Sequence, residues 1–229
     1  MMAGPLLFIS MCTFIANDLN DREKDRINHP ERPLPSGHIT PTFAATLYFL
    51  CLAAALFTTR YCVEDKTAFW YYFLTALSIS YGHVVEFLPL IKAPYVAAVI
   101  SLPILIVASN FRDSRLYWIA VAIFLFNLGK ELCMDVLDRP GDKVTAMHTV
   151  APRQIALSTI GLQLTSLAVL LALSVNGSRR MTTVLLASNA LLQALSAYHL
   201  LMRANMRIAI QLMRIELLVS LYFVALPSY

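Results

Sequence analysis

The sequence predicts an all-α integral membrane protein with a single transmembrane domain over residues 1–229. Hydrophobic residues make up 58% of the chain and charged residues 14%, a composition far more apolar than that of an average soluble domain. Apolar runs long enough to cross a hydrocarbon layer of about 30 Å recur along the whole length, separated by short loops. Because no alternating strand pattern occurs, these runs are predicted to satisfy their backbone groups as helices.

About eight transmembrane helices are expected, one for each apolar segment. The first segment starts at Met1 and lacks a basic region in front of it, so it is predicted to be a retained helix rather than a signal peptide. Prolines such as Pro41, Pro94 and Pro103 stand near segment ends or kink points and favour tilted or broken helices. The segments cover about residues 3–16, 41–59, 66–82, 94–110, 115–134, 154–175, 181–202 and 206–226.

The charge pattern and the spacing of the cysteines argue against a nucleic-acid partner, disulfides and a zinc site. The formal net charge is +4, but no Lys/Arg stripe interleaved with aromatic residues occurs, so no nucleic-acid partner is expected. The four cysteines show no C-x-x-C spacing and mostly fall inside apolar runs, which argues against disulfides and a zinc site. Lys and Arg are more frequent in the loops after segments one, three, five and seven, so these loops are predicted to face the cytosol.

A first carboxylate cluster follows the first apolar segment and reads NDLNDREKD. Asn17, Asp21 and Asp25 recur every four residues, so they share one face of a helix that continues out of the segment. The alternative without a functional role is a charged loop at the membrane surface whose acidic residues pair with neighbouring basic residues.

A second cluster ends the fifth segment and reads KELCMDVLDRPGD. Glu131, Asp135, Asp138 and Asp142 fall at spacings of four, three and four, again one helical stripe, although the Pro-Gly pair before Asp142 is expected to end the helix. Both clusters lie on the same predicted side of the membrane.

Rows of carboxylates repel one another in a medium of low dielectric constant unless a cation compensates them. Aspartate and asparagine oxygens suit Mg²⁺, which binds one or two carboxylates together with water and phosphate oxygens. Two facing rows would therefore hold a diphosphate, and nearby cations would contact its remaining oxygens. The candidate cations are Arg22, Lys24, Lys130 and Lys143.

The two clusters belong to longer motifs that resemble the signatures of the UbiA superfamily of intramembrane prenyltransferases. The first, NDxxDxxxD followed by RINHPERPLPSGHIT, includes Asn17, Asp18, Asp21, Asp25, Asn28 and residues 32–37. The second, an acidic stripe followed by a threonine, is matched by Lys130, Glu131, Asp135, Asp138, Gly141, Asp142 and Thr149. The resemblance extends over essentially the whole chain.

The resemblance implies a bundle of nine transmembrane helices around a central cavity that is capped by the two motif loops and open sideways to lipid. Here the motifs follow the first and fifth segments, one segment earlier than in the family, so the family's first helix is expected to be absent. Either the start of the chain is truncated or mis-assigned, or the protein is a reduced member of the family. Many members of the family also carry a Tyr-x-x-x-Lys motif. Here Tyr81 is followed four places later by Val85, with Lys92 a possible substitute eleven residues on, and Ala146 replaces a usual glycine of the second loop.

The site residues that the resemblance implies fall into three groups. The Mg²⁺ ligands are Asn17, Asp18, Asp21, Asp25, Asp135, Asp138 and Asp142. The catalytic residues among them are Asp21, Asp25, Asp138 and Asp142. The substrate-binding residues are Arg22, Lys24, Arg32, Tyr81, Lys130 and Lys143.

The implied activity is transfer of an isoprenyl group from an isoprenyl diphosphate to a lipophilic aromatic or alcohol acceptor in membrane lipid. Mg²⁺ would neutralise the departing diphosphate, and aromatic faces would stabilise the allylic cation in a water-poor cavity. A UbiA-type terpene cyclase, in which the substrate's own double bonds capture the cation, is the alternative, and a channel or degenerate scaffold is a third. The aromatic candidates, each also explained by ordinary packing, are Tyr48, Trp70, Tyr71, Tyr72, Phe73, Trp118, Phe124 and Phe126.

Overall fold

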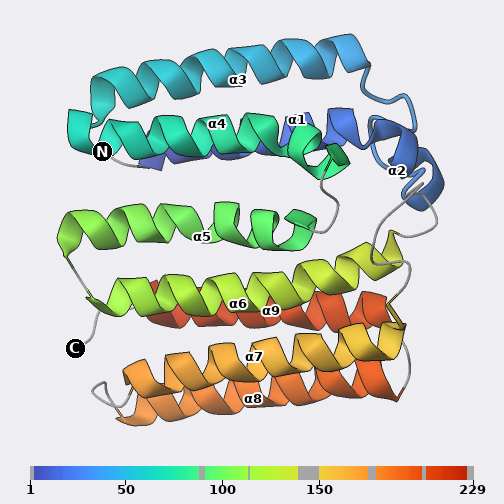
Figure 1. The fold of residues 1–229 in the computed structure, drawn as a ribbon, viewed down its shortest axis with the longest axis vertical. Helices are drawn as coiled ribbons and strands as arrows, with labels where there is room; N and C mark the ends of the chain where they lie inside the picture. The colour runs from blue at the N-terminus through green and yellow to red at the C-terminus, as the bar shows by residue number, and fades with distance from the viewer. Residues whose placement is uncertain are drawn as a thin grey trace. The chain divides into compact units, whose positions relative to one another are not determined.

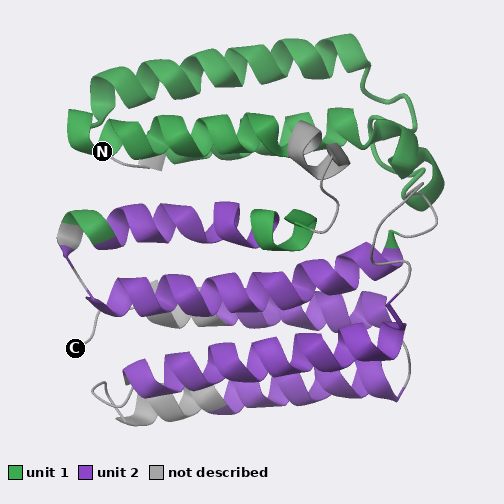
Figure 2. Cartoon of the chain, viewed as in Figure 1, with its two compact units in different colours: residues 1–95, 109–111, 138–145 green, residues 96–108, 112–137, 146–229 purple. Residues whose placement is uncertain are grey.

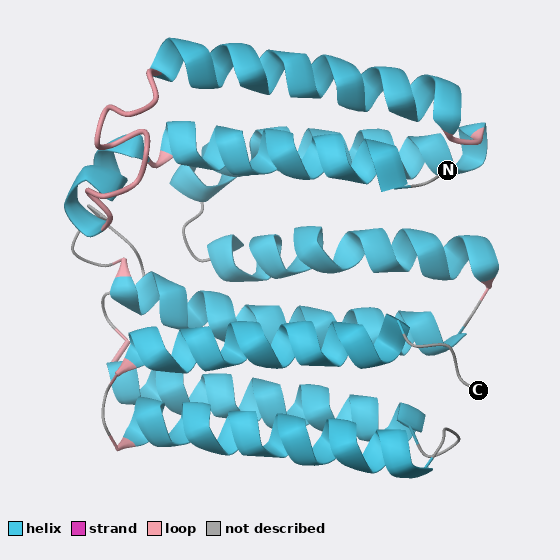
Figure 3. Ribbon diagram, turned by 180° about the vertical axis from the view of Figure 1, so that it is seen from behind, coloured by secondary structure: helices cyan, strands magenta, loops and turns pink. Residues whose placement is uncertain are grey.

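The computed structural model describes residues 3–87, 91–112, 114–138, 150–174, 179–202 and 205–225. Every regular element in these residues is a helix (Figure 3). Eight long helices of the described chain coincide with the eight predicted segments, so the predicted all-α class is confirmed. The helices are α1 (Ala3–Asn20), α2 (Arg22–Asn28), α3 (Pro41–Cys62), α4 (Asp65–Phe87), α5 (Lys92–Phe111), α6 (Ser114–Leu137), α7 (Pro152–Ser174), α8 (Arg179–Leu201) and α9 (Met206–Ala225).

Three helices of the described chain, α3, α5 and α7, are long and apolar enough to cross a membrane by length and composition alone. Other long helices are less apolar because they carry charged side chains within their length. Lys130 and Asp135 lie in α6, and Glu216 lies in α9. Charged groups inside such helices are costly in lipid and commonly mark functional positions.

The chain divides into two compact units (Figure 2). Unit 1 comprises residues 1–95, 109–111 and 138–145, and unit 2 comprises residues 96–108, 112–137 and 146–229. Helix α5 therefore contributes residues to both units. The first carboxylate cluster lies in unit 1, and the second starts in unit 2 and continues into unit 1 at Asp138.

Unit 1 is built on α1, which packs against α3 and α4, while α3 also contacts α4 (Figure 1). Cys12, Ala55 and Tyr71 are among the side chains buried in these helices. Helix α3 begins with a proline at its first position, and the hydroxyl of Thr40 accepts a hydrogen bond from the backbone N–H of Phe43 at 3.3 Å. This N-cap ends the first motif loop and starts the span.

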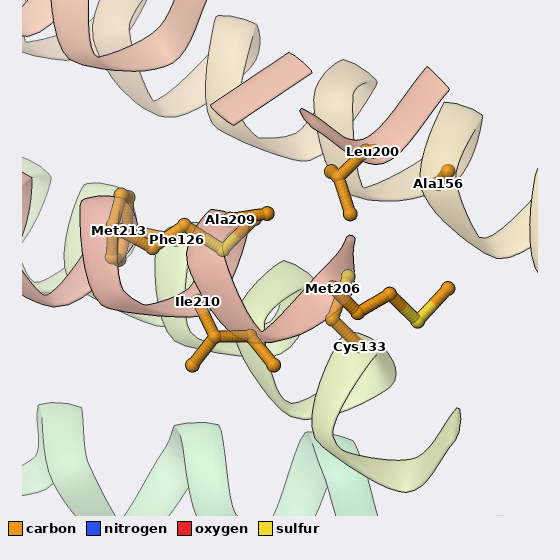
Figure 4. Packing of buried hydrophobic residues seen from close by; sticks show 8 residues of the cluster. All are labelled: Phe126, Cys133, Ala156, Leu200, Met206, Ala209, Ile210 and Met213. Atoms are coloured by element: carbon orange, nitrogen blue, oxygen red, sulfur yellow. The ribbon is translucent and has the colours of Figure 1, made fainter. Parts of the chain in front are cut away.

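In unit 2, α7 packs against α6 and α8, and α9 packs against α8 and α6, which closes a four-helix ring (Figure 1). A cluster of buried apolar side chains lies within it (Figure 4). Between α6 and α7, Gly129 allows close approach, because a Cβ there would lie 3.3 Å from atoms of Thr159. The Thr159 hydroxyl donates to the Gly129 carbonyl at 3.0 Å, which joins the two helices. The cluster comprises Phe126, Cys133, Ala156, Leu200, Met206, Ala209, Ile210 and Met213.

Candidate functional site

The first carboxylate stripe keeps its helical register across the junction between α1 and α2. The backbone N–H of Asp21 donates to the Asn17 carbonyl, and the N–H of Asp25 donates to the Asp21 carbonyl, both at 2.8 Å. The backbone N–H of His29 in turn donates to the Asp25 carbonyl at 2.7 Å. These bonds span four residues each, so Asn17, Asp21 and Asp25 share one face as the spacing predicted.

Asp25 is the most deeply buried acid of this stripe, with 5% of its surface exposed. Its carboxylate accepts a hydrogen bond from the Arg32 guanidinium at 2.7 Å. The pair lies at a cavity of about 110 Å³ whose wall also includes Asp18. Phe43 and Leu47 form an apolar part of the wall of this cavity. Two predicted metal ligands and one predicted phosphate-binding residue therefore line one cavity in unit 1.

The loop between α2 and α3 is folded by local hydrogen bonds that position Arg32. The N–H and hydroxyl of Ser36 both donate to the Arg32 carbonyl, at 3.0 and 2.6 Å, and the N–H of Ile39 donates to the Pro33 carbonyl at 3.0 Å. Gly37 closes the turn with a φ of 81°, a left-handed conformation that favours glycine. The proline-rich motif thus acts as a rigid support for the guanidinium that contacts Asp25.

Other acidic residues of the first cluster pair with basic residues, as expected for a charged loop at the membrane surface. Lys24 lies 3.4 Å from Asp21, and Arg26 donates to Glu23 at 2.7 Å. Both pairs are at least partly exposed to solvent, so they contribute little to stability. Arg22 differs, because its Nε is buried and has no hydrogen-bond partner in the described part of the chain. A buried guanidinium donor of this kind is available to an anionic ligand.

Asp138, from the second motif, lies beside the end of α2 within unit 1. The Asn28 side-chain amide donates to the Asp138 backbone carbonyl at 3.0 Å. The His29 ring lies on the same side, with Nε2 3.8 Å from Asp138 Oδ1 and Nδ1 3.4 Å from Glu31 Oε1. A hydrogen bond from its own backbone, together with His29, lowers the pKa of Glu31. The sequence pattern assigned no role to His29, whose only signal is its position directly after Asn28.

The remaining residues of the second motif lie in unit 2 or outside the described residues. Asp135 is buried in α6, with 2% of its surface exposed. Lys130, predicted to bind phosphate, forms an ion pair with Glu131 at 2.9 Å, and both side chains are mostly buried. Asp142 and Lys143 lie outside the described residues, so their predicted roles stay predictions.

Tyr81, predicted to bind substrate, lies in α4 with its ring 6.0 Å from the ring of Tyr95. The Tyr95 hydroxyl donates to the Leu77 carbonyl at 2.5 Å and lies 2.8 Å from the Ser80 hydroxyl. These contacts join the start of α5 to α4 within unit 1. Tyr95 could not be predicted from the sequence, because an aromatic residue in an apolar segment carries no distinguishing signal.

The aromatic candidates for cation stabilisation divide by burial. Trp70, Phe73 and Trp118 are exposed, and Tyr71 is fully buried in unit 1. Phe126 lies in the apolar cluster of unit 2 (Figure 4). The structure therefore shows ordinary hydrophobic packing for Phe126.

Within the described residues, no three carboxylate, histidine or cysteine side chains converge on a point that would hold a metal ion. The donor set of unit 1 nevertheless suits Mg²⁺, because this ion uses one or two carboxylates and keeps water or phosphate oxygens in its other positions. Asp18 and Asp25 on one cavity wall supply such a pair.

Residues 1–218 match the UbiA prenyltransferase family. The chain belongs to the UbiA prenyltransferase family. The family match covers both carboxylate motifs, so the resemblance inferred from them is confirmed. With its apolar helices, this UbiA protein is an integral membrane protein.

Three relatives illustrate how far the similarity extends. A digeranylgeranylglyceryl phosphate synthase of Pyrococcus furiosus is 34% identical over 140 residues, which cover 59% of this chain and 49% of the relative. The apo structure of a UbiA homologue from Aeropyrum pernix K1 matches with a TM-score of 0.77 at 16% identity, over 97% of this chain and 86% of that chain. A solved structure described as giving insights into digeranylgeranylglyceryl phosphate synthase in membranes matches with a TM-score of 0.64 at 18% identity, over 96% of this chain and 82% of that one.

The two solved structures confirm the UbiA fold. The chain spans about half the length of the curated relatives it matches. Its activity, substrates and partners are therefore proposals that depend on its own residues.

Proposed function

We propose that this chain is a Mg²⁺-dependent prenyltransferase that moves an isoprenyl group from an isoprenyl diphosphate to the hydroxyl of a lipophilic acceptor. The observation that carries the proposal is the cavity of unit 1, which places Asp18, Asp25 and Arg32 together in a member of a prenyltransferase family. The name of the Pyrococcus furiosus relative supports an alcohol acceptor of the glyceryl phosphate class over an aromatic one.

The proposed metal ligands are the oxygens of the two aspartate motifs. Asp18, Asp21 and Asp25 offer carboxylates from α1 and α2, Asn17 offers an amide oxygen from the same face, and Asp138 lies beside the end of α2. Asp135 and Asp142 are included on the motif pattern alone. When bound, Mg²⁺ supplies positive charge to the diphosphate leaving group.

The cationic side chains of the first motif would bind the diphosphate. Arg22 presents a buried Nε without a partner in the described chain, and Arg32 is held at the cavity by its loop. Lys24 lies two residues after Arg22 in α2 and, being 43% exposed, can exchange Asp21 for a phosphate oxygen. Tyr81, Lys130 and Lys143 complete the proposed substrate-binding set.

The chain's own residues also separate the reaction from water. The cavity wall beside Asp18 and Asp25 includes Leu34, Phe43 and Leu47, which are apolar. An apolar wall protects an allylic cation from capture by water until the acceptor hydroxyl attacks it. The C–O bond to the diphosphate breaks first and gives the cation; a C–O bond to the acceptor oxygen then forms, and the acceptor's proton is released to solvent.

The experiment is a turnover assay of the purified protein in lipid with geranyl, farnesyl and geranylgeranyl diphosphates and Mg²⁺. We expect slow diphosphate release without an acceptor, with prenyl alcohol as the only product, and a prenyl ether when a glyceryl phosphate or another lipid alcohol is added. Loss of diphosphate binding in EDTA would support the metal role. Cyclic terpenes formed at full rate from the diphosphate alone would replace the proposal with the cyclase alternative.

We also propose that the motif loops face the cytosol. The exposed Cys62 ends α3, on the opposite side by the alternation of the spans, while Cys12, Cys51 and Cys133 are buried. A membrane-impermeant maleimide added to intact cells should therefore modify Cys62 and spare a Cys62→Ser variant. Labelling of Cys62 only after the cells are opened would reverse the assignment.

A further inference from the structure

Unit 2 buries a set of polar side chains that the proposed reaction does not use. On α7 and again on α8, three polar residues follow one another at spacings of four and three, so each set lies on one helix face. Glu216 of α9 joins them. No member has more than 7% of its surface exposed. The set comprises Thr159, Gln163, Ser166, Asn189, Gln193, Ser196 and Glu216.

Gln193 links three helices of the ring. Its Nε2 donates to Glu216 Oε1 at 2.7 Å and to the Gln163 backbone carbonyl at 3.2 Å. Three polar atoms of this cluster are buried and have no hydrogen-bond partner among the described residues: Gln163 Nε2, Gln193 Oε1 and Glu216 Oε2. Buried polar atoms without partners are costly, so three of them in one cluster indicate that a polar group completes it.

A cavity lies against this cluster. Gln193, Glu216 and Ser166 supply its polar wall, and the rest of its lining, from Ile119 to Leu217, is apolar. Its volume is about 20 Å³. A water molecule needs at least about 10–15 Å³, so the cavity has room for a group of that size.

The surroundings favour a neutral carboxyl group at Glu216. The cavity residues from α6, α7 and α8 carry no charge, and in the described chain no ion pair reaches Glu216. Arg214 lies two residues earlier in α9 on its exposed face, which points away from Glu216. An unpaired carboxylate in such a place would be expensive, whereas the neutral acid needs only hydrogen bonds.

We propose that Ser166, Gln193 and neutral Glu216 form a hydroxyl-binding site inside unit 2, and that one ordered water occupies it. The inventory of donors and acceptors fits. The water accepts from the Glu216 acid O–H and donates to Gln193 Oε1. The Ser166 hydroxyl, which already donates to the Ala122 carbonyl at 2.8 Å, accepts the second water proton. The site is independent of the proposed transfer reaction.

The test is infrared spectroscopy of the full chain in lipid at neutral pH, comparing the wild type with Glu216→Gln. We expect a carbonyl band of a protonated carboxylic acid that shifts in D₂O and disappears in Glu216→Gln. Glu64→Gln, the same chemical change at an exposed position, should leave the band unchanged. Glu216→Gln keeps the shape and most hydrogen bonds, so its unfolding temperature should stay within about 3 °C of the wild type.

A structure from lipid-grown crystals provides the second readout, and it separates water from a lipid hydroxyl. One compact density peak within hydrogen-bond distance of Glu216 and Gln193, retained after delipidation, would support the proposal. Elongated density lost on delipidation would overturn the water assignment. Absence of the protonated-acid band would show that Glu216 is a carboxylate and would overturn the proposal. Stabilisation of the protein by NaCl relative to choline chloride, if lost in Glu216→Gln, would show that a cation binds this carboxylate and would also overturn the proposal.

Discussion

The Asn28 amide donates to the backbone carbonyl of Asp138 at 3.0 Å, across 110 residues of sequence. This bond ties the end of α2 to the second aspartate motif. It is a side-chain contact to backbone, so it holds the position of Asp138 without engaging the Asp138 carboxylate.

Replacing Asn28 by alanine should remove this tie. A neutral hydrogen bond contributes about 1 kcal/mol, so kcat/KM should fall about fivefold, with a weaker apparent affinity for Mg²⁺. The measurement is steady-state turnover across a Mg²⁺ titration. Thr46→Ala, which deletes an exposed hydroxyl that donates to the Thr42 carbonyl within α3, is the control. An Asn28→Ala enzyme with unchanged Mg²⁺ dependence would show that the tie is incidental.

Asp21→Asn should lower turnover by at least about 100-fold while the protein stays folded in detergent, because it removes charge from the proposed metal row. Glu23→Gln makes the same chemical change two residues away, where the side chain is 71% exposed and pairs with Arg26. Its activity should stay close to that of the wild type. Asp138→Asn should behave like Asp21→Asn. Comparable activity in the Asp21 and Glu23 variants would contradict the assignment of the stripe.

Arg32→Met should destabilise the protein by about 1–2 kcal/mol, because it leaves the buried Asp25 carboxylate without its 2.7 Å partner. The cost is moderate because the Arg32 side chain is itself 38% exposed. Adding Asp25→Asn to Arg32→Met should recover part of the loss, since a neutral amide no longer needs the guanidinium. Thermal unfolding of the four members of this double-mutant cycle measures the coupling, and strictly additive effects would argue against the pair.

Gly129→Val should destabilise unit 2 by about 2–3 kcal/mol, because even a Cβ at this position lies 3.3 Å from Thr159 atoms and the branched side chain adds further atoms. Gly129→Ala should cost less. Gly161→Ala is the matched control in α7, since a Cβ added there would meet no described heavy atom within 4 Å, and the change should be neutral or slightly stabilising. Unfolding temperatures in detergent compare the three variants. Equal temperatures for Gly129→Val and Gly161→Ala would exclude the close packing of α6 on α7.

Several features could be predicted from the sequence because they depend on local periodicity. The eight long helices follow apolar runs, and the face shared by Asn17, Asp21 and Asp25 follows from the helical repeat. The family could be recognised from its two motifs because their residue spacing is preserved along the chain. The predicted metal ligands and substrate contacts stay predictions that the variants above test.

Contacts between distant segments required the tertiary structure. Neither the bond from Asn28 to Asp138 nor the packing of Tyr95 on Tyr81 leaves a periodic signal, because each joins residues whose own segments do not determine the partner. The same holds for Glu216, which in the sequence is a single acid in an apolar helix. Only the packing of α7, α8 and α9 showed that it is buried beside Gln193, because burial and hydrogen-bond partners depend on which helix faces meet.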